Sequence, residues 1–77
     1  MHNSMRSIPV KELPIRLGQF LKLANLVQDG FEARMKIEQG RVMVNGLPET
    51  RRGKKLFLDD TITIEGETWR VGADEER

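Results

Sequence analysis

The chain has 77 residues, with 13 Lys and Arg, 12 Asp and Glu, and no cysteine. This length allows one small domain and leaves little room for a deep pocket. Without cysteine there is no disulfide bond and no thiolate metal site, so an apolar core must supply the stability. The apolar runs are too short to span a membrane, and the first residues lack the apolar run of a signal peptide. We therefore expect one cytoplasmic domain over residues 1–77.

The formal net charge of +1 hides a separation of charge along the chain. Residues 34–55 contain seven Lys or Arg and two Glu, a net charge of +5. Residues 56–77 contain seven Asp or Glu and two Arg, a net charge of −5. Because a polyanion responds to the local field rather than to total charge, the middle of the chain is the part suited to an anionic partner.

The beginning of the chain predicts a short strand and then a helix. Residues 1–7 and the polar residues 72–77 are expected to be disordered tails around a core over residues 8–71. Within that core, Ile8-Pro9-Val10 is expected to form a strand, which the proline confines to a sheet edge. From Leu17 onward, apolar residues recur at the i, i+3, i+4, i+7 spacing of a helix, which should end near residues 24–25.

A second helix is predicted between Asp29 and Gly40. Asp29 suits the N-cap, and Glu32 three residues later completes the pattern of a capping box. Gly40 suits the position that follows a helix, where the backbone often becomes left-handed.

This second helix carries two apolar stripes. Ala33 and Ile37 form one stripe, and Phe31 and Met35 form another, so we expect burial on more than one side. Lys36 is expected to be a solvated helix residue.

A tight hairpin and two further strands follow. Asn45-Gly46 between alternating valines is a strong hairpin signal, because a type I′ turn needs positive φ at both central residues. The first strand covers residues 41–44, and Pro48 limits how far the return strand can pair. Residues 61–64 and 68–71 alternate between apolar and polar side chains and predict two more strands.

Residues 56–60 lie between the hairpin and these strands. Leu56 and Leu58 are expected to share an apolar face, with Phe57 out of phase with them. Asp59-Asp60 is expected to form a turn and to have a structural role rather than a catalytic one. The chain has one histidine, His2, near its start. We therefore assign no catalytic residue, no cofactor and no metal ligand, and expect no enzymatic activity.

Residues 51–55, with the sequence RRGKK, contain four cations in five positions. Arginine offers forked donors, lysine offers a point charge, and Gly53 allows close approach of the backbone, so the loop is typical of a phosphate-binding segment. The alternative is a solvated loop that only improves solubility.

In their order and spacing, residues over positions 15–71 resemble the S4-type RNA-binding domain, which also occurs in tyrosyl-tRNA synthetase, pseudouridine synthases and a ribosome-associated heat-shock protein. Residues 17–26 and 49–56 more closely resemble its small stand-alone members, the YbcJ-like proteins. The matching positions are Arg16-Leu17, Phe20-Leu21, Ala33, Ile37, Gly40, Val42, Val44-Asn45-Gly46, Asp60, Ile62 and Ile64.

The resemblance implies an α+β fold in which two short helices pack on a small, mostly antiparallel sheet. It also implies binding of structured RNA, ribosomal or transfer RNA, through the helix pair and the hairpin with its following loop. The ribosome or its precursors are then the expected partners of a monomeric protein. The RNA-facing candidates, carried over by position, are Arg16, Lys22, Arg34, Arg41, Asn45, Arg51, Arg52, Lys54 and Lys55.

Three positions depart from the family pattern. Asp59 stands where glycine is frequent, so we expect a different turn there. Lys36 stands where an apolar residue is common, so the second helix is expected to be more exposed at this point. Gly18 replaces an aspartate of the wider family, as it does in many stand-alone members.

Some roles have two interpretations at this stage. Arg34 either contacts phosphate or pairs with Glu38 one turn later. Asn45 is first a turn residue, and any RNA contact is secondary. Among the aromatic residues, Phe57 is the best candidate to stack on a base, because Phe20 and Phe31 have the spacing of core residues. For the whole chain, the alternative to RNA binding is a protein-interaction adaptor that uses the acidic C-terminal third.

Overall fold

The computed structural model describes residues 5–74 and contains two helices and seven strands in that range. Both predicted helices are present, and the strands cover the predicted segments together with short additional ones. The elements are β1 (Arg6–Val10), β2 (Ile15–Arg16), α1 (Leu17–Leu23), α2 (Gly30–Glu38), β3 (Val42–Val44), β4 (Leu47–Pro48), β5 (Lys55–Leu56), β6 (Thr61–Ile64) and β7 (Glu67–Ala73).

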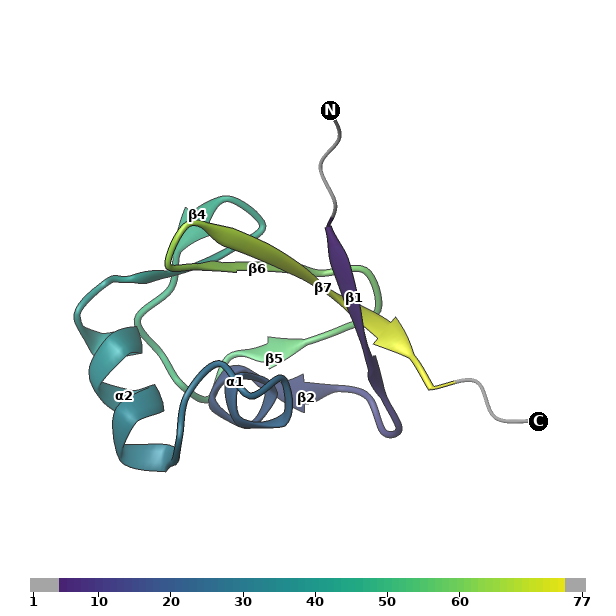
Figure 1. The fold of residues 1–77 in the computed structure, drawn as a ribbon, viewed down its shortest axis with the longest axis horizontal. Helices are drawn as coiled ribbons and strands as arrows, with labels where there is room; N and C mark the ends of the chain where they lie inside the picture. Colours follow the sequence, from purple (N-terminus) through teal and green to yellow (C-terminus); the bar gives the residue numbers. More distant parts are fainter. Residues whose placement is uncertain (1–4, 75–77) are drawn as a thin grey trace.

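The main sheet has the strand order β1-β7-β6-β3-β4. Only the β1–β7 pair is parallel; the other pairs are antiparallel, and tight turns join β3 to β4 and β6 to β7. A separate two-stranded ribbon joins β2 to β5. Figure 1 shows both helices on the same side of the main sheet as this ribbon. The protein therefore has the predicted α+β fold, with two helices packed on a mixed sheet.

Both ends of the described chain are more ordered than the sequence predicts. β1 begins at Arg6 and pairs with β7 in the register that joins Arg6 to Trp69 and Val10 to Ala73. The expected tails over residues 1–7 and 72–77 are therefore wrong where they overlap these strands; residues 1–4 and 75–77 lie outside the described range. Polar side chains do not prevent pairing, because the ladder is formed by backbone groups.

The core lies between the helices and the sheet. Leu17, Phe20 and Leu21 of α1 are completely buried. In α2, Ala33 and Ile37 are buried. They pack with buried residues of the strands and loops, which are Val10, Val27, Val42, Val44, Leu56, Ile62, Ile64, Trp69 and Val71.

The ends of α2 follow from its capping residues. A carboxylate oxygen of Asp29 accepts a hydrogen bond from the backbone N–H of Glu32 at 2.9 Å. The Glu32 side chain reaches back to the N–H of Gln28, at 2.6 Å, rather than to Asp29 itself, so the predicted box is displaced by one residue. At the other end, Gly40 has φ of +75°, as expected for the residue after a helix.

The second apolar stripe of α2 is not buried, and this prediction is wrong. Phe31 is 69% exposed and Met35 is 38% exposed, because only the flank with Ala33 and Ile37 faces the sheet. Leu58 is also 50% exposed and does not share the burial of Leu56.

The turn residues adopt the conformations that their positions require. Asn45 and Gly46 have φ of +53° and +84°, which confirms the predicted type I′ signature of the hairpin. Asp59 has φ of +73° and so takes the left-handed conformation that a glycine would favour. The expectation that this turn differs from that of other family members stays a prediction.

Candidate nucleic-acid interface

The loop over residues 51–54 is fixed to the beginning of α1 by its backbone. The N–H of Leu17 donates to the carbonyl of Lys54 at 2.8 Å, and the N–H of Gly18 donates to the carbonyl of Arg52 at 3.0 Å. The Arg16 guanidinium donates to the carbonyl of Gly53 at 3.1 Å. These bonds satisfy helix N–H groups that lack intrahelical partners. The cationic loop is therefore held against the helix.

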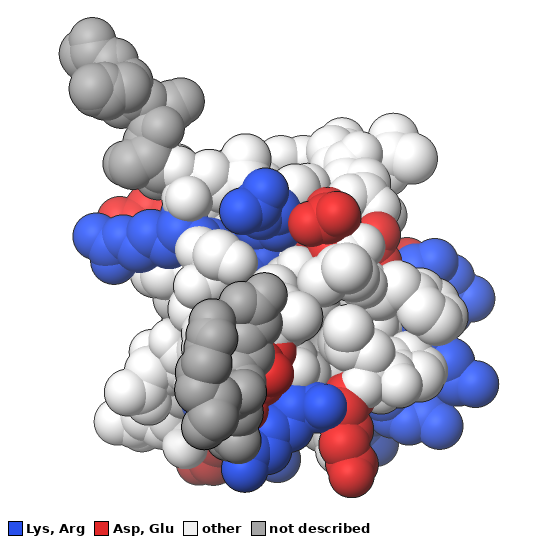
Figure 2. Space-filling view, turned by 90° about the vertical axis from the view of Figure 1, so that its right-hand side faces the viewer, with Lys and Arg blue, Asp and Glu red and all other residues white. Residues whose placement is uncertain are grey.

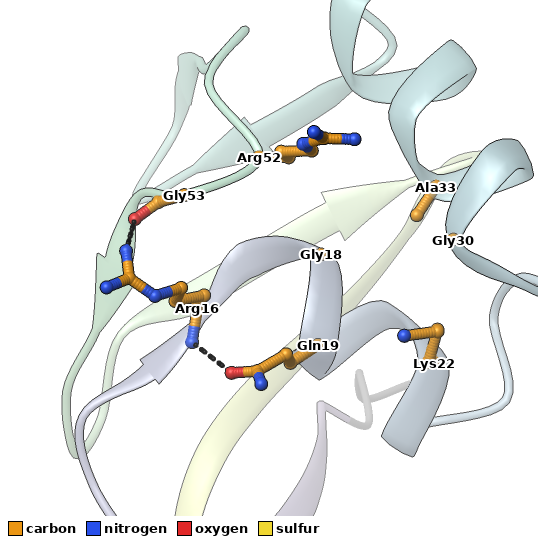
Figure 3. A pocket seen from close by; sticks show the side chains of 8 residues that line it. All are labelled: Arg16, Gly18, Gln19, Lys22, Gly30, Ala33, Arg52 and Gly53. Atoms are coloured by element: carbon orange, nitrogen blue, oxygen red, sulfur yellow. Dashed lines mark hydrogen bonds between the residues drawn. The ribbon is translucent and has the colours of Figure 1, made fainter.

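A hollow of about 290 Å³ lies between this loop and the two helices. In Figure 3 the side chains of Arg52 and Lys22 extend into the region between α1 and α2, while Arg16 lies at the other end of the group. On the α2 side, Gly30 leaves the hollow open, because a Cβ atom there would meet nothing within 4 Å. The residues that line it are Arg16, Gly18, Gln19, Lys22, Gly30, Ala33, Arg52 and Gly53.

Three of the nine predicted RNA-binding residues line this hollow: Arg16, Lys22 and Arg52, which we call the hollow cations. None of them has a carboxylate within ion-pair distance among residues 5–74. Their side chains are also exposed to solvent. The hollow is therefore a concentration of uncompensated positive charge, which attracts anions.

The remaining loop cations have different surroundings. The Nε atom of Arg51 lies 2.9 Å from a carboxylate oxygen of Glu49, whose side chain is only 13% exposed. The hydrogen bond from Arg51 lowers the pKa of Glu49 below its ordinary value, and so keeps this carboxylate charged. Lys55 lies opposite Arg16 in the β2–β5 ribbon, and Lys54 is partly buried.

Arg34 has the ion pair that was the alternative to phosphate contact. Its Nε atom lies 3.2 Å from a carboxylate oxygen of Glu38, and both side chains are about half exposed. Such an exposed i, i+4 pair contributes little to stability, but Arg34 would have to exchange this partner in order to contact another anion.

Lys36 of α2 and Arg41, which follows the end of this helix, both contact the β6–β7 turn, and we call them the sheet-side cations. Both contact the same carboxylate oxygen of Glu65 at 3.0 Å. Lys36 also pairs with Glu32, and its side chain is only 18% exposed, so the expectation of a solvated lysine is wrong. The hydrogen bond between Lys36 and Glu65 raises the pKa of Lys36. Together with the charge of Arg41, it lowers the pKa of Glu65.

Asn45 uses its side chain within the fold. Its amide nitrogen donates to Asp60 at 3.1 Å, and its amide oxygen accepts from the N–H of Thr61 at 2.9 Å. Asp60 in turn accepts from the N–H of Phe57 at 2.8 Å. The interpretation of Asn45 as first a turn residue therefore agrees with its geometry, and Asp60 has the expected structural role.

Gln19 and Gly30 line the hollow but were not predicted as site residues. The amide oxygen of Gln19 accepts from the N–H of Arg16 at 3.3 Å, the N3-to-N-cap contact of a capping box, which sequence can indicate. Gly30 is the first residue of α2, and a methyl group in place of its hydrogen would meet no atom within 4 Å. The packing therefore does not require a glycine at position 30, and a glycine at a helix start is only a weak sequence signal for an open surface.

A second face of the molecule has a different charge pattern. Figure 2 shows the end where β1 and the last residues of β7 lie, and there Lys and Arg side chains are interspersed with Asp and Glu.

Within residues 5–74, no group of three or more His, Cys, Asp or Glu could hold a metal ion. None of the helices in that range has the length and apolar character needed to cross a membrane.

Comparison with known proteins identifies the family. The model of the S4 domain matches residues 8–72. The chain belongs to the S4 domain family. Its relatives include a Bacillus subtilis (strain 168) protein named "Probable ribosome maturation protein RlbA", 48% identical over 52 residues that form 68% of this chain and 73% of the relative. An Escherichia coli (strain K12) protein named "Putative RNA-binding protein YbcJ" is 32% identical over 59 residues, 77% of this chain and 84% of the relative.

Membership in the S4 family confirms the resemblance seen in the sequence. The matched range of this S4 domain contains both helices, the hairpin and the loop with the RRGKK sequence. All nine predicted RNA-facing positions therefore lie inside the family match.

Proposed function

We propose that this S4 domain binds structured RNA, ribosomal or transfer RNA, through the hollow cations and the adjoining loop over residues 51–55, and that it catalyses no reaction. The observation that carries the proposal is the hollow between α1, α2 and the loop, lined by three exposed cations without a carboxylate partner in the described chain. A phosphate that enters it replaces water and counterions rather than a protein carboxylate.

The geometry is suited to a folded backbone rather than to a base sequence. Arg16 and Arg52 offer forked donors from the loop side, and Lys22 offers a point charge from α1. Contacts of this type to phosphates position a protein on RNA but do not read its bases. Recognition of RNA by shape is therefore the mode that we propose.

The names of the relatives agree with this proposal. One relative is named for ribosome maturation and the other for RNA binding, and both cover more than two thirds of this chain. We accordingly propose ribosomal RNA, or a precursor of the ribosome, as the first partner to test.

The protein-interaction adaptor receives less support. Of the acidic residues after position 55, Glu65 holds two cations, and Asp60 accepts two hydrogen bonds from Asn45 and Phe57. The charge of Glu65 is compensated within the fold and the carboxylate of Asp60 is used in hydrogen bonds, so these two groups are less available to a basic partner.

The test is a fluorescence-anisotropy titration of the protein with a ribosomal RNA fragment and a transfer RNA at several salt concentrations. Binding should weaken steeply with salt, because phosphate contacts release counterions. Arg51→Ala, Arg52→Ala, Lys54→Ala and Lys55→Ala each remove one loop cation, and should weaken binding similarly for both RNAs.

Glu67→Ala is the matched control, because Glu67 is an exposed charge in the acidic part of the chain. It should leave affinity unchanged or slightly higher. An absence of RNA binding by wild type at low salt would contradict the proposal and favour the adaptor. Unchanged affinity in all four loop variants, with unfolding curves like wild type, would make RRGKK a solubilising loop only.

A further inference from the structure

The exposed aromatic ring of Phe31 is not used by the fold. Phe31 is 69% exposed, whereas Phe20 is completely buried. Large apolar side chains are usually removed from water, and an exposed phenylalanine contributes nothing to the core. Its neighbour one turn later, Met35, is also exposed, so the outer flank of α2 carries an apolar strip.

The helical period places this strip beside the hollow. Ala33 and Ile37 face the core, and Lys36 faces the β6–β7 turn, so Gly30 and Arg34 occupy the opposite flank. Arg34 is about 40° and Phe31 about 100° around the helix axis from Gly30. Going around the helix axis from the hollow, one therefore meets Arg34 first and the ring of Phe31 next.

The space between the hollow and the ring is open. Gly30 lines the hollow and directly precedes Phe31, and nothing lies within 4 Å of the position of a Cβ atom at Gly30. An RNA strand with a phosphate in the hollow can thus extend over Gly30 toward the ring.

We propose that Phe31 is a stacking platform for an unpaired RNA base whose strand is held by the hollow cations. The proposal rests on the RNA-binding function above and names the kind of RNA, a helix interrupted by a bulged or looped nucleotide. Exposed aromatic rings beside a cationic groove are the usual means by which proteins hold unpaired bases. The adjacent cations favour a nucleic acid over an apolar protein segment as the occupant.

Phe57 is the obvious competitor, since it is also exposed, at 52%. Neither Phe57 nor its chain neighbours line the hollow, whereas Gly30, the neighbour of Phe31, does. Stacking is therefore assigned to Phe31, and Phe57 serves as an internal control.

The test uses three RNA hairpins with the same stem. The first stem is fully paired, the second has one bulged nucleotide, and the third has the same bulge without its base. The bulged and abasic RNAs have the same phosphates, so the ratio of their dissociation constants reports contact with the base alone. Each is titrated by fluorescence anisotropy with wild type, Phe31→Ala, Phe31→Trp and Phe57→Ala.

Wild type should bind the bulged RNA roughly 5- to 150-fold more tightly than the abasic RNA, the range that corresponds to stacking of one base. Phe31→Ala should abolish this ratio while keeping the affinity for the fully paired stem and the unfolding midpoint. Phe31→Trp and Phe57→Ala should retain the ratio.

Two results would overturn the inference. If wild type binds all three RNAs but the ratio is one, or is unchanged by Phe31→Ala, Phe31 does not stack on a base and RNA binding itself still stands. If wild type binds none of the RNAs at low salt, the proposed function fails together with the inference.

Discussion

Lys36 of α2 and Arg41, which follows this helix, share the carboxylate of Glu65 in the β6–β7 turn. Between α1, α2 and the loop, by contrast, Lys22 and Arg52 have no carboxylate partner in residues 5–74. A cation that already has a partner must exchange it in order to bind phosphate, and gains less from doing so. The sheet-side cations therefore serve the fold, and the hollow cations are available to a ligand.

The comparison extends to the polar residues of the hairpin. Asn45 belongs to the part that serves the fold, because its side chain bonds to Asp60 and Thr61. Each prediction below is chosen so that a variant affects either stability or RNA binding but not both.

The largest effect on stability is expected for Asn45→Ala. The variant loses both side-chain hydrogen bonds and places an alanine at φ of +53°. The free energy of unfolding should fall by about 2–4 kcal/mol. Urea unfolding measures the loss, and RNA affinity of the folded protein should change little. If instead RNA binding is lost at unchanged stability, Asn45 is an RNA contact and does not belong to the residues that serve the fold.

A second variant, Gly30→Glu, should affect RNA binding and leave the fold intact. A side chain at Gly30 meets open space, and a carboxylate is well tolerated at a helix start. It would place a negative charge beside the hollow and weaken RNA binding by about tenfold, or ~1.4 kcal/mol, at low salt. Gly30→Gln is the matched neutral variant. Equal losses of RNA affinity in Gly30→Glu and Gly30→Gln would indicate a steric effect and no role for the charge of the hollow.

The pH dependence of stability tests the sheet-side cations. Because Lys36 lowers the pKa of Glu65, this carboxylate stabilises the fold above its ordinary pKa of about 4.3 and loses that contribution as pH falls through the lower folded value. The raised pKa of Lys36 means that the same contribution disappears at alkaline pH, as the lysine loses its proton.

Glu65→Gln should therefore unfold at lower urea than wild type near pH 7, and the difference should shrink toward pH 3. Urea midpoints across this range measure it, with Glu67→Gln as the control. A difference that stays constant with pH would show that the ion pairs with Lys36 and Arg41 do not contribute.

The smallest expected effect is that of Asp59→Gly. Asp59 is held at φ of +73°, and its ion-pair contact is a distant one with Arg70 at 4.0 Å. Glycine relieves the backbone strain but increases the freedom of the unfolded chain, so the gain should not exceed ~1 kcal/mol. Thermal unfolding measures the change. A loss of more than 1 kcal/mol would mean that the aspartate side chain stabilises this turn.

The backbone of the fold was largely predictable because its signals are local. The Asn45-Gly46 turn, the Asp29 cap, the Gly40 helix end and the alternation of residues 61–64 each depend on a few neighbouring residues. The pairing of β1 with β7 was missed in part, because it joins residues about 60 positions apart through backbone groups and leaves no side-chain pattern.

The site was predictable as a set of cations but not as a surface. Counting charges treats Arg41 and Arg52 alike, whereas only the fold places Glu65 beside Arg41. The partner of Arg34 lies four residues away and was foreseen, while Glu65, which Lys36 shares with Arg41, lies 29 residues from Lys36 and was not. Phe31 was misjudged because periodicity shows that a stripe is apolar but not which flank of the helix meets the sheet.

The most direct test of the central claim is the salt dependence of RNA affinity in single variants of the two groups. Arg16→Gln, Lys22→Gln and Arg52→Gln should each reduce the slope of log affinity against log salt by roughly 0.7–0.9, the effect of one lost phosphate contact. Arg41→Gln removes an equal charge from the sheet-side group and should leave the slope unchanged while lowering stability slightly. An equal reduction in all four variants, or one confined to Arg41→Gln, would contradict the assignment of phosphate binding to the hollow.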